Sequence, residues 1–218
     1  LVIGGPYANA ETGVSFVVFG AASTPQSTLD LGALNGLNGF SLAGLSAGDR
    51  SGIAVAGAGD FNGDGFADFV IGAEFADPHG INSGSSYLIF GAENFSASID
   101  LTTLNGASGL RIDGTTPGDR SGKTVAAAGD VNGDGYGDLL IGAPGSDTSG
   151  DNAGSTYLLF GAASGFAATL DLSSLDGSRG LRFDGRIVNT GSDVSGSAVS
   201  SAGDLNGDGY DDIVIGAE

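Results

Sequence analysis

The stretch "DFNGDGFAD" spans residues 60–68, and close copies follow as "DVNGDGYGD" at 130–138 and "DLNGDGYDD" at 204–212. Every copy has a side-chain oxygen at positions 1, 3, 5 and 9 and a glycine at positions 4 and 6. This is the order of ligands in the first nine residues of an EF-hand calcium loop, in which the glycine at position 6 permits a sharp turn. A hard cation such as Ca²⁺ binds about six to eight oxygen atoms. The pattern therefore predicts a cation site in each loop.

The predicted ligands are the side chains at positions 1, 3, 5 and 9 together with the backbone carbonyl at position 7. We expect three Ca²⁺ sites, formed by Asp60, Asn62, Asp64, Phe66 and Asp68, by Asp130, Asn132, Asp134, Tyr136 and Asp138, and by Asp204, Asn206, Asp208, Tyr210 and Asp212. Asp, Asn and Gly also make good turns without a metal, but three copies with the same ligand positions favour a metal site. Mg²⁺ demands a stricter geometry, and Zn²⁺ would need His or Cys.

The loops also depart from the EF-hand. Position 12, where an EF-hand has a bidentate Glu, is Ile71, Ile141 or Ile215. No helical pattern flanks the loops, and a strand-like run follows each one directly. We therefore expect β-hairpin calcium loops in which water or other groups complete the coordination shell.

The whole chain repeats with a period of about 70 residues, since Asp60, Asp130 and Asp204 are 70 and 74 residues apart. Each repeat contains four short apolar runs separated by turn residues, which is typical of β-strands. Four antiparallel strands per repeat is the content of one propeller blade. The sequence thus predicts an all-β fold made of β-propeller blades. A recurring "DLxxLxG" before the fourth strand is expected to form a helical turn or a tight loop.

Composition narrows the classes of partner. The net charge is −19, with 7 Lys and Arg against 26 Asp and Glu, so the surface repels nucleic acids and anionic lipids. No run approaches the ~18 apolar residues that cross a bilayer, so membrane insertion is not expected. The absence of Cys excludes disulfides and thiolate metal sites.

The repeat divides the chain into blades. We expect a partial blade with strands 2 to 4 in residues 1–44, complete blades in 45–114 and 115–185, and a partial blade with strands 1 and 2 in 186–218. Three periods cannot close a propeller, because closure takes at least about four blades. Further repeats of the same chain, or other copies of it, are therefore expected to complete the structure.

"FG" at Phe90-Gly91, the acidic loops and "IGAP" at residues 141–144 together resemble the FG-GAP repeat, which builds the seven-bladed propeller of integrin α subunits. The "GDRSG" elements at 48–52 and 118–122 resemble more closely those of large bacterial secreted and surface proteins. The resemblance implies calcium binding at the loop positions given above and a location outside the cell or on its surface, in a bacterium. The last repeat departs from the pattern, with "SDVSG" in place of "GDRSG".

No catalytic constellation stands out. The single histidine, His79, is expected to be an exposed loop residue, and Arg50 and Arg120 are expected to bridge neighbouring blades through hydrogen bonds. Three functions remain open: a non-catalytic, calcium-stabilised module for adhesion or surface assembly, which we favour; a carbohydrate-binding propeller; and the accessory propeller of a secreted hydrolase. A protein ligand and a glycan ligand both stay open as further partners.

Overall fold

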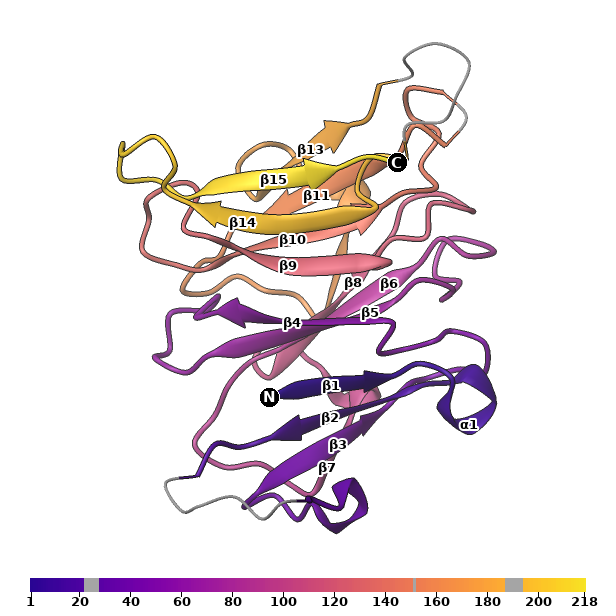
Figure 1. The fold of residues 1–218 in the computed structure, drawn as a ribbon, viewed down its shortest axis with the longest axis vertical. Coiled ribbons are helices and arrows are strands. Elements are labelled where there is room, and N and C mark those ends of the chain that lie inside the picture. The colour runs from indigo at the N-terminus through magenta and orange to yellow at the C-terminus, as the bar shows by residue number, and fades with distance from the viewer. Residues whose placement is uncertain (22–27, 151, 187–193) are drawn as a thin grey trace.

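The computed structural model describes residues 1–21, 28–150, 152–186 and 194–218. Four sheets are stacked face to face, from the N-terminal sheet at the bottom of Figure 1 to the C-terminal sheet at the top. The first sheet contains β1 (Val2–Gly5), β2 (Val14–Val18), β3 (Gly39–Ala43) and β7 (Ser98–Asp100). The second contains β4 (Ala54–Gly59), β5 (Asp68–Ala73), β6 (Ser85–Ile89), β8 (Gly109–Asp113) and β12 (Thr169–Asp171). The third contains β9 (Thr124–Gly129), β10 (Asp138–Ala143), β11 (Ser155–Leu159) and β13 (Gly180–Asp184), and the fourth β14 (Ala198–Gly203) and β15 (Asp212–Gly216).

The all-β prediction is confirmed, and the sheets are consistent with propeller blades. In the second sheet β4, β5, β6 and β8 pair antiparallel in this order, and in the third sheet β9, β10, β11 and β13 do the same, each from the inner strand outward. The pairing shifts by one residue near the end of β4, β9 and β14, just before each acidic loop. An extra residue in one strand of a pair bends that strand. Each acidic loop therefore follows a bend at the same position of its blade.

Two sheets contain one strand more than the predicted blade. β7 runs parallel to β3, and β12 runs parallel to β8, although both belong to the following repeat in the sequence. The expectation of purely antiparallel blades was therefore incomplete. The cause is the connection between the third and fourth strands of a blade, from β6 to β8 or from β11 to β13, which reaches back to the outer strand of the preceding blade and pairs with it for three residues. The blade boundaries inferred from the sequence stay a prediction. The last repeat is longer than the one before it, and residues 187–193 of this longer connection lie outside the described residues.

Each "DLxxL" segment forms a 3-10 turn, as expected. The three turns are η1 (Leu31–Ala33), η2 (Leu101–Thr103) and η3 (Leu172–Ser174), each capped by the side chain of the preceding aspartate. A fourth short element, α1 (Ala8–Glu11), is a turn with left-handed φ at Asn9, Ala10 and Glu11. The apolar "L" positions of η2 and η3 point inward, since Leu101 and Leu172 are buried.

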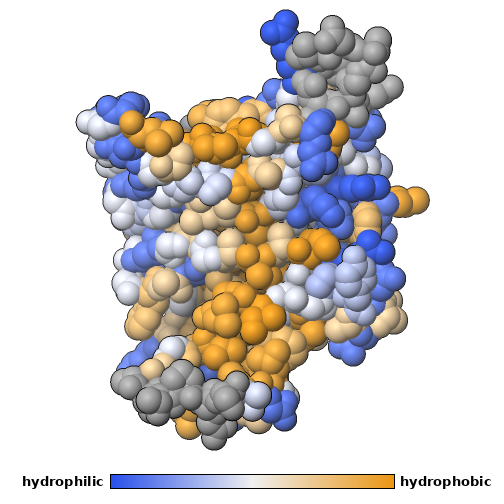
Figure 2. All heavy atoms as spheres, in the orientation of Figure 1, coloured by the Kyte–Doolittle hydropathy of each residue, from blue (hydrophilic) through white to orange (hydrophobic). Residues whose placement is uncertain are grey.

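The cores lie between sheets. All six residues of β5 and of β10 are buried, which is expected for strands covered on both faces. Phe69 and Ile71 of β5 pack with the first sheet, while Val70 packs with the third. Figure 2 shows apolar residues gathered in a band down the middle of the face that carries β1, β4 and β9. Because successive side chains of β5 point to opposite faces of its sheet, this strand packs against both neighbouring blades.

The stack is open. Among the described strands, β1 pairs with β2 alone and β15 with β14 alone, so each leaves one edge free. No helix in the described ranges is long and apolar enough to span a membrane. The described strands form no closed ring, in keeping with a propeller that is incomplete over this length.

Candidate metal-binding loops

The three acidic loops join the first strand of a blade to the second: β4 to β5, β9 to β10 and β14 to β15. All three lie on the same side of the stack, on the left in Figure 1. The glycines at position 6, Gly65, Gly135 and Gly209, have φ of 88°, 89° and 91°. A side chain is strained at such angles. The turn that the sequence predicted at this position is therefore present in each loop.

Backbone amides hold the acidic side chains in the same way in every copy. In the first loop, Asp64 N donates to Asp60 Oδ1 at 3.0 Å, and Gly65 N donates to Asp60 Oδ2 at 2.9 Å. Asp64 N also donates to Asn62 Oδ1 at 3.0 Å, and Phe66 N to Asp64 Oδ1 at 2.8 Å. The same four bonds recur in the second and third loops. Positions 1, 3 and 5 are thus fixed by the loop itself.

Position 9 has a different environment. Asp68 and Asp138 are 2% and 0% exposed. Asp68 accepts hydrogen bonds from Phe61 N at 2.8 Å and Gly91 N at 2.7 Å, and Asp138 accepts the corresponding two bonds at 2.9 Å each. Asp212 accepts one such bond, from Leu205 N at 2.8 Å. Position 9 therefore anchors its loop to the blade in the first two copies.

The electrostatics of position 9 favour a cation. The pKa of Asp68 and of Asp138 is raised to about 6, mainly by burial, although amide hydrogen bonds lower it in part. Neighbouring carboxylates contribute to the increase, Asp64 for Asp68 and both Asp134 and Asp130 for Asp138. A burial penalty and like charges both disfavour the ionised form, and a nearby positive charge opposes both effects. No Lys or Arg lies within any of the three loops. A divalent cation would supply the missing charge.

The donor chemistry fits a hard cation, since every predicted ligand offers oxygen. In the described ranges, however, no three side chains of His, Cys, Asp and Glu are gathered as a metal cluster. Instead, the acidic side chains at positions 1 and 5 accept hydrogen bonds from backbone amides of the same loop. The residues that would hold the ion are the five predicted in each loop, and this assignment stays a prediction.

Neighbouring loops also touch, which the sequence did not suggest. Gly137 N donates to Asp60 O at 2.9 Å, and Asp211 N to Asp130 O at 3.1 Å. A Cβ on Gly63 would lie 2.3 Å from the ring of Tyr136, and one on Gly133 would lie 2.5 Å from the ring of Tyr210. The aromatic ring at position 7 of one loop thus covers the glycine at position 4 of the preceding loop. The recurrence of an aromatic at position 7 was the available signal.

A comparison with family models identifies the repeat. The model described as FG-GAP repeat matches residues 51–89, 121–159 and 195–218. The chain belongs to the FG-GAP repeat family. Each matched segment contains one acidic loop and the strands on either side of it.

Similar proteins include integrin alpha-4 of Xenopus laevis, 29% identical over 178 residues, which are 82% of this chain and 15% of that protein. The phosphatidylinositol-glycan-specific phospholipase D of Bos taurus is 35% identical over 161 residues, 72% of this chain and 17% of the relative. Integrin alpha-V of Gallus gallus is 32% identical over 164 residues, which are 73% of this chain and 13% of that protein. The chain thus spans less than a fifth of the length of these relatives.

The Phe-Gly element of the FG-GAP repeat has a structural role here. Gly91 and Gly161 donate their amides to the position-9 carboxylates. A Cβ on Gly161 would lie 2.4 Å from Gly137 O, and one on Gly91 would lie 2.5 Å from the Cβ of Phe66. Contacts below 3.0 Å cannot be accommodated by the backbone without a shift. Only glycine lets the end of the third strand approach the loop this closely.

The two arginines of the "GDRSG" elements lie at the opposite end of the strands. Arg50 Nε donates to Glu11 Oε2 at 2.6 Å, and the Arg50 guanidinium lies 4.7 Å from the centre of the Phe75 ring. The prediction that Arg50 bridges blades through a hydrogen bond is confirmed. The Arg120 guanidinium contacts the same ring at 5.4 Å, so its side chain bridges blades by a cation–π contact instead.

His79 is an exposed loop residue, as expected, but it also has partners that the sequence did not suggest. Its side chain is 40% exposed, but both ring nitrogens face acceptors, Gly114 O at 2.7 Å and Asp171 Oδ2 at 3.3 Å. The single histidine therefore also joins two repeats. Sequence gave no signal for this, because its partners lie 35 and 92 residues away along the chain.

Proposed function

We propose that this chain is a non-catalytic, calcium-binding module for adhesion or surface assembly outside the cell. The observation that carries the proposal is the threefold recurrence of one loop conformation, with the same four amide bonds to the residues at positions 1, 3 and 5. Membership of the FG-GAP family and the integrin α relatives support the adhesion or assembly role. When bound, calcium would neutralise the carboxylates of each loop and fix the hairpin.

Calcium binding is tested by counting sites. Isothermal titration of the chelator-treated chain with Ca²⁺ is expected to give three equivalents, and Asp64→Ala, Asp134→Ala and Asp208→Ala are expected to remove one equivalent each. Thr103→Ala, on an exposed turn away from the loops, is the control and should leave three. Binding of no calcium at millimolar concentration would overturn the proposal, and equal binding of Mg²⁺ would overturn the assignment of the ion.

The assembly role rests on the free strand edges. β1 and β15 each have one unpaired edge among the described strands, and Val214 of β15 is 53% exposed. An open edge pairs readily with another strand. We propose that further FG-GAP repeats, or other copies of this chain, cover these edges. Sedimentation of the 218-residue chain should reveal self-association, and a monodisperse monomer with slowly exchanging amides along both edges would contradict it.

One relative supports a second candidate, the accessory propeller of a secreted hydrolase, because its name is that of a phospholipase D. The chain spans only 17% of that protein. An assay for release of a phosphatidylinositol-glycan-anchored protein tests whether the chain itself is catalytic. The isolated chain is expected to release none. Release that survives extensive purification would overturn the non-catalytic proposal.

A further inference from the structure

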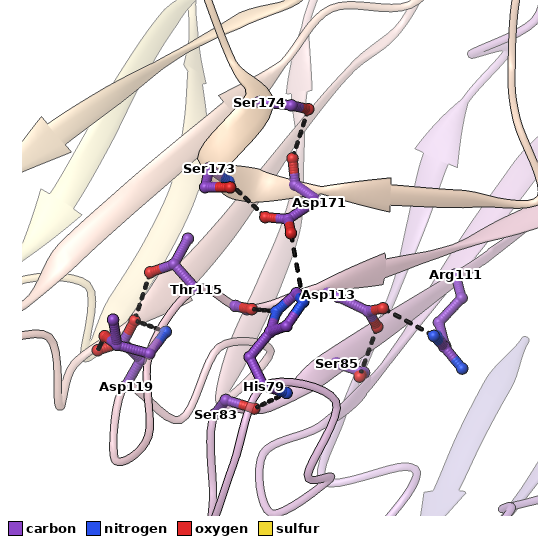
Figure 3. Close-up of polar contacts among 12 residues, drawn as sticks. His79, Ser83, Ser85, Arg111, Asp113, Thr115, Asp119, Asp171, Ser173 and Ser174 are labelled. Atoms are coloured by element: carbon purple, nitrogen blue, oxygen red, sulfur yellow. Dashed lines mark hydrogen bonds and ion pairs between the residues drawn. The ribbon is translucent and has the colours of Figure 1, made fainter.

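His79 joins two successive repeats where β12 pairs with β8 (Figure 3). The residue lies in the loop between β5 and β6. Its Nδ1 is 2.7 Å from the carbonyl oxygen of Gly114, directly after β8, and its Nε2 is 3.3 Å from Oδ2 of Asp171, the last residue of β12. The imidazole thus spans the second blade and the strand that the third repeat contributes to it.

Both partners of the ring are acceptors. A carbonyl oxygen and an ionised carboxylate have no hydrogen to donate, and a neutral imidazole carries a hydrogen on only one nitrogen. The neutral form of His79 can therefore donate to Gly114 or to Asp171, and its other nitrogen then faces an acceptor. The doubly protonated form donates to both.

We propose that His79 is a pH-dependent clamp. When the ring is protonated, its bonds to Gly114 O and Asp171 stabilise the pairing of β12 with β8, and when the ring is neutral one of these two bonds is lost. Histidine is the side chain that ordinarily changes charge between about pH 5 and 8. The strand it holds is short, three residues long and parallel. One charge-assisted bond is therefore a substantial part of its attachment.

Other charged groups near the clamp are already engaged. Asp113 of β8 is held by Arg111 at 2.8 Å and by Ser85 at 3.0 Å. Asp77, on the same loop as His79, accepts from the amide of Asn82.

Asp119, in the loop after β8, accepts from the hydroxyls of Thr115 at 2.7 Å and Thr116 at 2.6 Å. Asp171 is the acid that contacts the ring in the described part of the chain. Burial works against the charged form of Asp171, but hydrogen bonds from Ser173 and the proximity of His79 outweigh it and lower the pKa of this carboxyl. Asp171 therefore stays ionised throughout the range in which histidine titrates.

The first junction provides a matched comparison without a histidine. There β7 pairs with β3, and Asp100 takes the place of Asp171. Asp100 accepts from Thr102 N at 2.9 Å and Thr102 Oγ1 at 2.7 Å. The facing connection, residues 6–13, contains α1, and its titratable groups are Tyr7 and Glu11, of which Glu11 is paired with Arg50.

Amide hydrogen exchange tests the clamp at both junctions in one experiment. Arg111 N donates to Ala168 O at 2.9 Å across the β8–β12 pair, and Ser41 N donates to Ala97 O at 3.0 Å across the β3–β7 pair. After correction for intrinsic rates, and with chelator present throughout, the protection of Arg111 is expected to fall about five- to tenfold between pH 5.5 and pH 8. The protection of Ser41 is expected to stay constant.

Two variants assign the effect. His79→Gln should abolish the pH dependence at Arg111, and Asp171→Asn, which keeps a good capping residue for η3, should reduce it. Asp100→Asn is the matched control and should leave it intact. The proposal is overturned if Arg111 shows no pH dependence, if His79→Gln retains the dependence, or if Arg111 and Ser41 change together.

Discussion

The loops at 130–138 and 204–212 share their inner geometry and differ at position 9. In both, the amides of positions 5 and 6 bond to the first aspartate, at 2.9 to 3.1 Å. Asp138 is completely buried with two amide donors, whereas Asp212 is half-buried with one. The difference arises because a third strand, β11, ends in Phe160-Gly161 over the second loop. The nine residues alone set the turn, and the rest of the blade sets the environment of its last ligand.

The largest expected difference between these loops is in the loss of the position-9 carboxylate. In chelator, Asp138→Ala should lower the free energy of unfolding by about 3 kcal/mol, because two buried amides lose their acceptor. Asp212→Ala should cost less than about 1 kcal/mol. Urea denaturation of both variants measures the contrast, and Asp138→Asn, which keeps one acceptor oxygen, should fall between them. Equal losses for Asp138→Ala and Asp212→Ala would refute the anchoring role.

The second effect concerns the glycine that covers the loop. Gly161→Ala should destabilise by about 2 kcal/mol, because the added methyl group collides with Gly137 O and Phe61 O. Gly20 is the same element of the first repeat, and a Cβ there would meet nothing within 4 Å. Gly20→Ala should therefore change stability by less than about 0.5 kcal/mol. If thermal melts show that both substitutions are equally tolerated, the close approach of the loop to Gly161 does not explain why the Phe-Gly element contains a glycine.

A smaller effect is expected for the contact between loops. Tyr136→Ala should destabilise by about 1 kcal/mol, since it uncovers Gly63 of the preceding loop. Tyr136→Phe keeps the ring and should be nearly neutral. In calcium titrations, Tyr136→Ala should also weaken the affinity of the 60–68 loop, which can be followed in a chain whose other two loops are disabled by Asp134→Ala and Asp208→Ala. An unchanged affinity of the first loop would show that the contact is structural only.

The strands and loops could be predicted because they depend on local sequence. The turn at Gly65, Gly135 and Gly209 follows from the need for positive φ, and the paired strands follow from short apolar runs between turn residues. The 3-10 turns at "DLxxL" follow from an aspartate that caps them. Each of these features is encoded within about ten residues and is present three times.

Apart from the hydrogen bond of Arg50, the contacts between repeats were not predicted, because they join residues that lie far apart along the chain. The parallel strands β7 and β12 are three residues long and polar in part, so they lack the alternation of an apolar strand. The ring of Tyr136 over Gly63 and the clamp at His79 depend on how one blade lies on the next. Within one blade, the hydrogen bond from Gly91 N to Asp68 needs the third strand in place.

We propose that calcium binding at the three loops stabilises this fold, and thermal unfolding with and without calcium tests this most directly. For sites with a Kd of about 0.1 mM, 2 mM Ca²⁺ should raise the melting temperature by about 10 °C or more relative to chelator, and 2 mM Mg²⁺ should have little effect. Asp134→Ala should lose about one third of the calcium-dependent shift. Identical wild-type melts in calcium and in chelator would contradict the claim and leave the loops as hydrogen-bonded turns.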